Sequence, residues 1–177
     1  MLDSPMLSGW KARAVRAAKA AGIGERFSPG HVSKRRRQHG PSAAAAFEHF
    51  AAKPACARWA PGVLRYDMAC GIERHGSAHR LSFDRTVKTA IYNALPHQLA
   101  RMLRAHALRC PMAFVRGTET QEIRQVGMAA TTRLAHGRVS RISGSHLCPF
   151  EHPLATATEV PRRISAMNSL PPAAGAR

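Results

Sequence analysis

The feature that most constrains the fold is a strand, helix and strand pattern toward the C-terminal end of the sequence. Pro111 to Val115 is a short apolar run typical of a buried strand, and Val139 to Ile142 is a second run that begins and ends on a β-branched residue. The segment between the runs carries apolar residues at helical spacing, namely Ile123, Val126, Ala130 and Leu134. Two strands joined by one helix form a βαβ unit, whose crossover is right-handed and whose strands are therefore parallel.

The turn after the second run holds the leading candidate for a functional residue. His146 lies in a Gly/Ser turn that follows the strand end and precedes a helix expected from Leu154. Because parallel strands end at the same edge of a sheet, Gly117 to Glu119 should lie beside Gly144 to His146. Such an edge commonly carries catalytic or ligand-binding side chains. A structural histidine in an ordinary turn is the alternative interpretation.

The chain from Gly9 to Leu108 shows helical patterns and no strand pattern. Helices are expected over Gly9 to Ala21, Ser42 to Lys53, Val63 to Cys70, Ser82 or Asp84 to Pro96, and Leu99 to His106. The helix that ends at Pro96 has the firmest apolar spacing, and Glu73 to Arg80 is expected to be a loop. The sequence thus predicts a helical region followed by a small α/β core.

Several of these segments resemble the α/β-hydrolase family. Arg109 to Gly117, a helix-length gap and then Gly144 to Leu147, followed by Glu151 and Pro153, resemble the C-terminal part of that family. In the family, this part contains the strand, helix, strand and histidine loop that complete a catalytic triad.

Two further segments extend the likeness over most of the chain. Leu81 to Pro96 is similar to the mobile cap region of the family, and Leu2 to Pro5 is similar to the end of its sixth strand. The resemblance therefore implies an α/β protein with a partial α/β-hydrolase fold, in which a short parallel sheet (βαβ at 111–142) accompanies a mostly helical cap region. It implies three parts: the end of a core strand and the cap region over 1–108, the core with the histidine loop over 109–168, and a disordered tail over 169–177.

The resemblance also assigns roles to individual residues. Hydrolysis by a triad needs a nucleophile, a base and a carboxylate that orients the base. His146 would be the base, since imidazole accepts and returns a proton near neutral pH. The orienting acid would be Asp3, at the tip of the preceding strand, or Glu119, just after the strand at Pro111 to Val115. We favour Asp3, because a glutamate in the first turn of a helix is explained by the helix dipole alone.

The nucleophile of the family is not found in this sequence. It lies in a G-x-S-x-G motif on a strand-to-helix turn, and no such motif occurs among the 177 residues. Ser145 is expected to be structural. The chain is therefore interpreted as a truncated, C-terminal fragment of a hydrolase for ester or related bonds, inactive alone and acting on a small ester-like substrate if the missing half is supplied.

Charge supports a second function class. The formal net charge is +17, which is typical of proteins that bind nucleic acid or another anionic partner. The arginines are scattered, however, and Lys34 to Arg37 is the only tight basic run in the sequence. With few aromatic residues between the charges, this run is more simply interpreted as a solvated loop. A non-enzymatic basic protein that binds nucleic acid is the alternative, and is not favoured.

Metal, cofactor and membrane signals are weak in the sequence. The four cysteines are widely spaced and the ten histidines form no H-E-x-x-H pattern, so neither a metal nor a cofactor is predicted, and reduced structural thiols are expected. There is no apolar run near the ~18 residues that cross a bilayer, so no membrane partner and a cytoplasmic location are predicted. The sequence does not indicate an oligomeric state.

Overall fold

The predicted strand pair lies at the centre of one of two compact units in the computed structural model, which describes residues 1–94, 96–106, 108 and 110–169. This first unit contains Met1–Ala14 and the chain from His97 onward, and the second contains Val15–Pro96. The predicted division at residue 108 remains a prediction, and residues 170–177 of the predicted tail lie outside the described residues.

The sheet of the first unit is parallel, as the sequence predicts. Strand β4 (Phe114–Gly117) pairs in parallel with β5 (Val139–Ile142), in a register that joins Phe114 to Val139 and Gly117 to Ile142. Leu2 extends this arrangement through a parallel bridge to Val115 on the other side of β4. Because its carboxyl end shares an edge with β4, the N-terminal segment reaches the site edge of the sheet.

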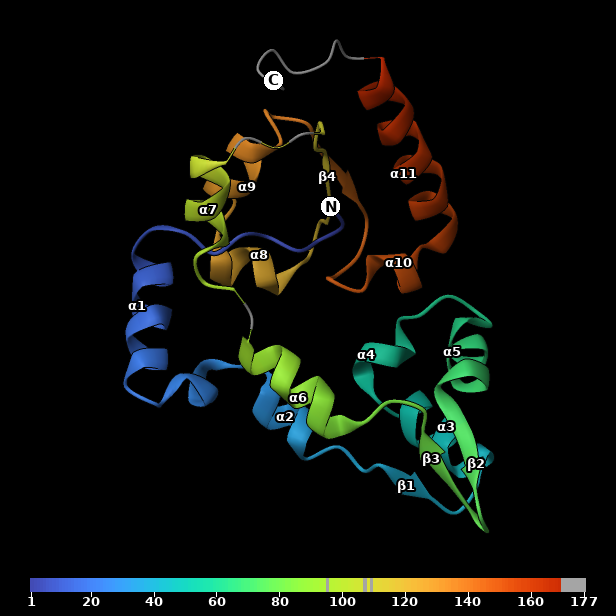
Figure 1. The fold of residues 1–177 in the computed structure, drawn as a ribbon. Coiled ribbons are helices and arrows are strands. Elements are labelled where there is room, and N and C mark those ends of the chain that lie inside the picture. The colour runs from blue at the N-terminus through green and yellow to red at the C-terminus, as the bar shows by residue number, and fades with distance from the viewer. Residues whose placement is uncertain (95, 107, 109, 170–177) are drawn as a thin grey trace. The chain divides into compact units, whose positions relative to one another are not determined.

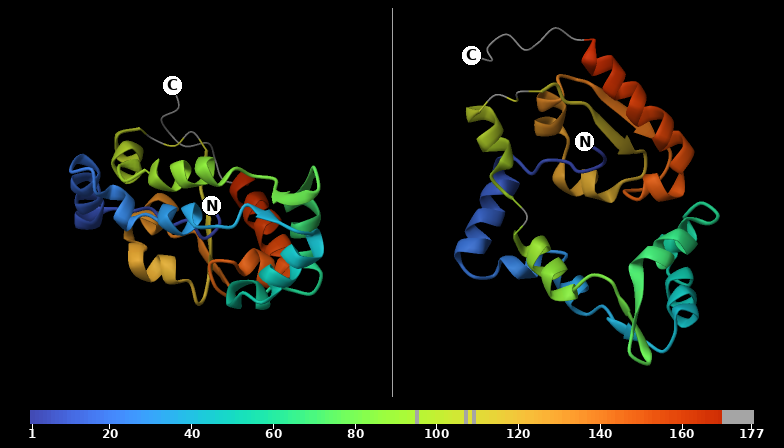
Figure 2. Two further views of the ribbon diagram at one scale, coloured as in Figure 1. Left: turned by 90° about the horizontal axis from the view of Figure 1, so that it is seen from below. Right: turned by 45° about the vertical axis from the view of Figure 1, so that its right-hand side comes forward.

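Helices cover both faces of this strand pair (Figures 1 and 2). Helices α8 (Gln121–Val126) and α9 (Ala129–Leu134) lie on one side, and α10 (Cys148–Glu151) and α11 (Pro153–Asn168) lie on the other. One core cluster joins Phe114, Ile123 and Ala135, and a second joins Val115, Ile142 and Cys148. Helix α7 (Leu99–Ala105) and the start of α1 (Gly9–Ala20) complete the unit.

The predicted helix between the strands is divided into two. Gly127 separates α8 from α9 and has a φ of +90°. Glycine adopts this conformation without the steric cost of a side chain. Thr118 and Gln121 have the spacing of a capping box, but the N-cap of α8 in the structure is Thr120. The Thr118 hydroxyl instead accepts a hydrogen bond from the Gly144 amide, 3.3 Å away, across the sheet edge.

The second unit combines helices with a small antiparallel sheet. Its elements are η1 (Gly24–Phe27), α2 (Gly30–Lys34), β1 (His39–Gly40), α3 (Ala43–Ala51), α4 (Pro54–Ala57), α5 (Val63–Gly71), β2 (Ile72–His75), β3 (Ala78–Leu81) and α6 (Arg85–Ala94). The strand order is β1-β3-β2. Ser42 caps α3 as expected, because its hydroxyl accepts a hydrogen bond from the Ala45 amide, 3.1 Å away.

The sheet of the second unit corrects the prediction that Gly9 to Leu108 has no strand and that Glu73 to Arg80 is a loop. These residues form the β2–β3 hairpin, which turns at Gly76 with a φ of +62°. The strands were missed because they consist mainly of polar residues and lack the alternating apolar pattern by which strands are recognised. A cross-strand ion pair between Glu73 and Arg80, at 2.6 Å, accompanies the pairing.

Candidate active site

The first part of the site comes from the N-terminal segment. The Asp3 amide donates a hydrogen bond to the Val115 carbonyl oxygen, 2.8 Å away, and the Val115 amide donates to the Met1 carbonyl oxygen, 2.9 Å away. Asp3 then turns out of the strand with a φ of +37°, an unusual conformation that aspartate tolerates better than most residues. Its side chain is 1% exposed, and Oδ1 accepts a long hydrogen bond of 3.4 Å from the Gly117 amide.

The loop after β5 is held by a buried carboxylate. Glu151, on α10, accepts hydrogen bonds from the Ser145 amide at 2.7 Å and from the Ser145 hydroxyl at 2.6 Å. The same hydroxyl accepts a hydrogen bond from the Leu147 amide, 3.0 Å away. Gly144 has a φ of +113°, and a Cβ atom there would collide with Glu151. The Ser145 hydroxyl is therefore hydrogen-bonded within the loop, both to Glu151 and to Leu147, the residue that follows His146.

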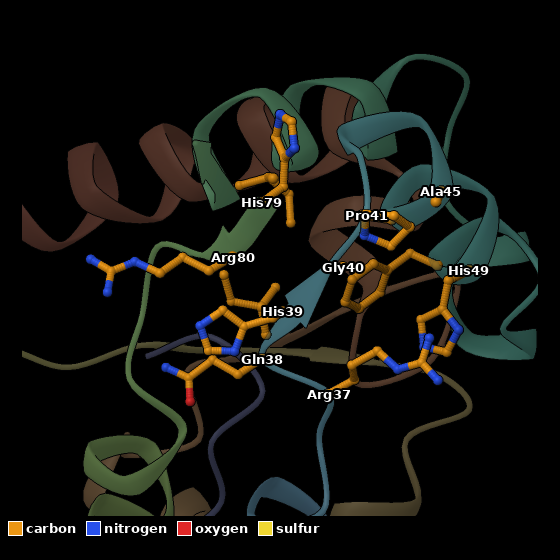
Figure 3. Close-up of a pocket in the computed structure, with 13 residues that line it drawn as sticks. Arg37, Gln38, His39, Gly40, Pro41, Ala45, His49, His79 and Arg80 are labelled. Carbon is orange, nitrogen blue, oxygen red and sulfur yellow. The ribbon is translucent and has the colours of Figure 1, made fainter. Parts of the chain in front are cut away.

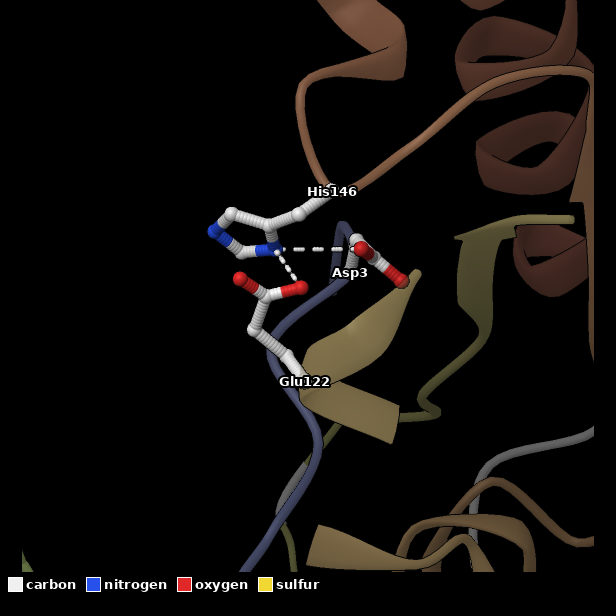
Figure 4. Close-up of side chains that lie close together, drawn as sticks. All are labelled: Asp3, Glu122 and His146. Atoms are coloured by element: carbon white, nitrogen blue, oxygen red, sulfur yellow. Dashed lines mark hydrogen bonds and ion pairs between the residues drawn. The ribbon is translucent and has the colours of Figure 1, made fainter. Parts of the chain in front are cut away.

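The geometry brings His146 and Asp3 together, although 143 residues separate them in the sequence. The Nδ1 atom of His146 lies 3.0 Å from Oδ2 of Asp3, so Nδ1 carries the proton and donates to the carboxylate (Figure 4). The Nε2 atom lies on the side of the ring away from Asp3. With 41% of its side chain exposed, His146 is half open to solvent while its partner is buried.

Glu119 is not brought to the imidazole in the same way. Its side chain is exposed, and its backbone amide donates a hydrogen bond to the Gly144 carbonyl oxygen, 2.8 Å away. Of the two acids named from the sequence, Asp3 is thus the one whose carboxylate contacts the histidine. Glu119 contributes its backbone to the contact between the strand tips.

A second carboxylate near His146 was missed by sequence analysis. Oε2 of Glu122, on α8, lies 4.0 Å from Nδ1 of His146, and the Thr120 hydroxyl donates a hydrogen bond to that same oxygen at 3.1 Å. Asp3, Glu122 and His146 together form a group of possible metal ligands. The spacing signal was absent because the three residues come from three distant segments.

Cys148 lies in the core next to this site. Burial, with the negative charges of Asp3 and Glu151 as further causes, raises the pKa of the Cys148 thiol to about 11. At neutral pH the group is therefore a neutral thiol and not a nucleophilic thiolate. It packs with Val115 and Ile142 as a structural residue, in agreement with the expectation for the cysteines.

A cavity of about 60 Å³ lies in the second unit and is lined by none of the predicted site residues. Its lining comes mainly from β1, α3 and β3 and includes Arg37, His39, His49 and His79 (Figure 3). Arg35 and Arg37 are exposed, whereas Arg36 is half-buried and its carbonyl oxygen accepts a hydrogen bond from Arg85, 3.1 Å away.

Within the described part of the chain, no helix is both long and apolar enough to cross a membrane.

Comparison with known proteins supports the fold but assigns no family and no activity to the sequence. The sequence matches no protein-family model and no curated protein. The structure is similar to the peroxisomal α/β-hydrolase Lpx1 of Saccharomyces cerevisiae, with a TM-score of 0.56 at 12% identity over 73% of this chain and 37% of that chain.

Two further solved structures show the same likeness. The esterase Rv0045c of M. tuberculosis has a TM-score of 0.57 at 17% identity, over 90% of this chain and 52% of that chain. The thioesterase domain from the curacin biosynthetic pathway has a TM-score of 0.56 at 14% identity, over 89% of this chain and 55% of that chain. The chain thus spans between 37% and 55% of the length of these neighbours. It has part of an α/β-hydrolase fold.

Proposed function

We propose that this chain is the base-and-acid half of an α/β-hydrolase that cleaves ester or related bonds. The observation that carries the proposal is the 3.0 Å contact between Nδ1 of His146 and Oδ2 of Asp3. In a triad, a buried carboxylate orients the imidazole through Nδ1 and stabilises the imidazolium that forms when Nε2 takes a proton. Asp3 and His146 would have these two roles, in the chain order acid and then base.

The nucleophile would come from polypeptide outside these 177 residues, because no G-x-S-x-G motif is present in them. Ser145 is a poor substitute, since its hydroxyl is hydrogen-bonded to Glu151 and to the Leu147 amide. The principal oxyanion donors of the fold follow the nucleophile and would be supplied with it. The substrate class, a small acyl ester, is part of the proposal and depends on that complement.

An esterase assay on two forms of the protein tests this function. The 177-residue chain alone should hydrolyse a p-nitrophenyl acyl ester no faster than its His146→Ala variant. The second form carries, ahead of Met1, whatever in-frame coding sequence precedes that codon in the gene. If this sequence supplies a G-x-S-x-G segment, hydrolysis should appear and fall by at least about 10³-fold in His146→Ala.

Two results would contradict the proposal. A rate well above the His146→Ala control in the 177-residue chain would show that the chain has its own nucleophile. An extended form whose activity is unaffected by His146→Ala would remove the proposed base. The matched control is His152→Ala, which changes an exposed histidine of the same loop region that lies outside the contact with Asp3.

A further inference from the structure

The imidazole of His146 faces two carboxylates rather than the one that a triad requires. Oδ2 of Asp3 lies 3.0 Å from Nδ1 and Oε2 of Glu122 lies 4.0 Å from it, and all three atoms lie within 4.8 Å of one another (Figure 4). With both acids ionised, even a protonated imidazole leaves the cluster with a net negative charge. Since Asp3 already accepts the hydrogen bond from Nδ1, a triad does not require a second carboxylate at this position.

We propose that Asp3, Glu122 and His146 bind a divalent transition-metal ion, with Zn²⁺ as the ion that suits these donors best. Imidazole nitrogen and carboxylate oxygen are both ordinary zinc ligands, and a set of three leaves a fourth position open. Bonds of about 2.0–2.2 Å in tetrahedral geometry place ligand atoms about 3.3 Å apart. The contact from Nδ1 to Asp3 is close to that value already.

Glu122 can complete the set with a small movement. Two distances to its carboxylate must shorten to the ligand spacing: the 4.0 Å to Nδ1 by about 0.7 Å, and the distance to the Asp3 oxygen, which is within 4.8 Å, by up to about 1.5 Å. A change of rotamer can supply this movement, because the Glu122 side chain is 46% exposed. Outer groups orient both carboxylates: the buried Thr120 hydroxyl donates to Oε2 of Glu122, and the Gly117 amide donates to Oδ1 of Asp3. Such partners hold metal ligands in place. The half-exposed imidazole leaves the open position accessible to water.

Metal binding and the proposed base function exclude each other. Coordination through Nδ1 replaces the proton that Nδ1 donates to Asp3, and that proton is released to solvent. An imidazole without this proton has lost the orientation and charge stabilisation that Asp3 supplies to a base. Bound metal would therefore inhibit hydrolysis. This consequence rests on the proposed function, whereas the binding itself does not.

Zn²⁺ titration by calorimetry, with the full chain and no substrate, tests the site. The exposed thiols of Cys70 and Cys110 are first changed to serine, because free thiols also bind zinc. In this background, Glu122→Gln should weaken the tightest Zn²⁺ site by about tenfold or more, and Thr120→Val by about 10–100-fold. Glu119→Gln, the matched control on a neighbouring exposed acid, should change the affinity by less than about twofold.

The titrations of these variants can contradict the proposed metal site. Equal effects of Glu122→Gln and Glu119→Gln, or an unchanged tight site in His146→Ala, would overturn the proposal. Circular dichroism and thermal unfolding show whether each variant is folded. Because the Glu122 side chain is 46% exposed, the Glu122→Gln variant remains informative even if His146→Ala fails to fold. A chain that binds Zn²⁺ as described but never supports hydrolysis with its complement would refute the proposed function and leave the metal site standing.

Discussion

The two units of this chain differ in how their apolar residues are used. In the first unit, both faces of the β4–β5 pair contribute fully buried side chains to helix-covered clusters. In the second unit, Met68 and Leu81 are the buried apolar side chains among the described residues, while Val87 and Ile91 of α6 are exposed. Since apolar burial is the main stabilising contribution, the difference indicates that stability is concentrated around the sheet that presents His146.

Helix α6 shows why apolar spacing alone does not reveal a core. The regular apolar positions of this helix that fall within the described residues are exposed: Val87, Ala90, Ile91 and Ala94. The helix packs on α2 through its polar side instead, where Gly30 allows a close approach to Asn93. Periodicity identifies the helix correctly, but the partner decides which face is buried.

A matched pair of isoleucine substitutions tests this difference with the largest expected effect. Ile142→Ala removes a side chain that is 6% exposed and should destabilise the chain by about 2–5 kcal/mol. Ile91→Ala, at a side chain that is 61% exposed, should change stability by no more than about 0.5 kcal/mol. Urea unfolding monitored by circular dichroism measures both. Equal losses would show that the apolar face of α6 is covered in solution.

A pair of glycine substitutions, one in each unit, should differ by a smaller amount in the free energy of unfolding. Gly144→Ala places a methyl group against the buried Glu151 in a backbone conformation that favours glycine, and should cost about 3 kcal/mol. Gly76→Ala, in the β2–β3 turn, meets open space and should cost about 1 kcal/mol for its positive φ alone. Thermal unfolding gives the difference. A Gly144→Ala protein as stable as Gly76→Ala would argue against the tight loop around His146.

An ion-pair network on α11 should contribute a modest, pH-dependent amount. Hydrogen bonds from Arg162, and also from Arg163, lower the pKa of Glu159 to about 2. A lowered carboxyl pKa contributes stability above the unfolded-state value of 4.5, and this contribution is lost as pH falls toward 2. Because Arg162 is largely exposed, Glu159→Gln should cost only about 1 kcal/mol at pH 7.

The pH dependence of stability provides a control for the Glu159→Gln substitution. The stability curves of the unchanged protein and of Glu159→Gln should converge as the pH falls from 5 to about 2, because the carboxylate is then protonated. Urea unfolding at a series of pH values measures this convergence. A constant difference across the range would mean that the substitution acts through packing and not through the charge.

The basic run of the second unit should have the smallest effect. Replacing Arg35, Arg36 and Arg37 together by alanine should leave weak binding to duplex DNA nearly unchanged at physiological salt, if the exposed Arg35 and Arg37 side chains are simply solvated. A phosphate contact would instead reduce the salt slope of binding by about one unit for each arginine removed. Fluorescence anisotropy distinguishes the two cases. Tight, sequence-dependent binding that the triple substitution abolishes would favour the nucleic-acid function over the hydrolase.

The sequence predicted the part of the fold in which local pattern and burial agree. β4, β5 and their parallel pairing follow from short apolar runs joined by one helix, and the end of the N-terminal strand at Asp3 follows from the family resemblance. The β2–β3 hairpin was missed because Glu73, Arg74 and Arg80 give no apolar alternation. Local pattern does not detect strands that consist mainly of polar and charged residues.

The candidate site was predictable in part for the same reason. His146 and Asp3 were named because each follows a strand at the same edge of the sheet. Glu122 was missed, since it lies inside a helix and approaches the imidazole only after α8 has packed beside the strand. Which acid contacts the histidine depends on the turn at Asp3, where the φ of +37° is a property of the folded chain that no spacing rule contains.

The central claim is that Asp3 holds the imidazole of His146 with the proton on Nδ1 and with Nε2 free to act as a base. Long-range ¹H–¹⁵N correlation spectra of the histidine side chains, recorded with a chelator to exclude bound metal, report the tautomer directly. The neutral imidazole of His146 should carry its proton on Nδ1, and Asp3→Asn should abolish this preference, while Glu119→Gln leaves it unchanged. A His146 ring that is protonated on Nε2 in the unchanged protein, or a tautomer indifferent to Asp3→Asn, would contradict the claim.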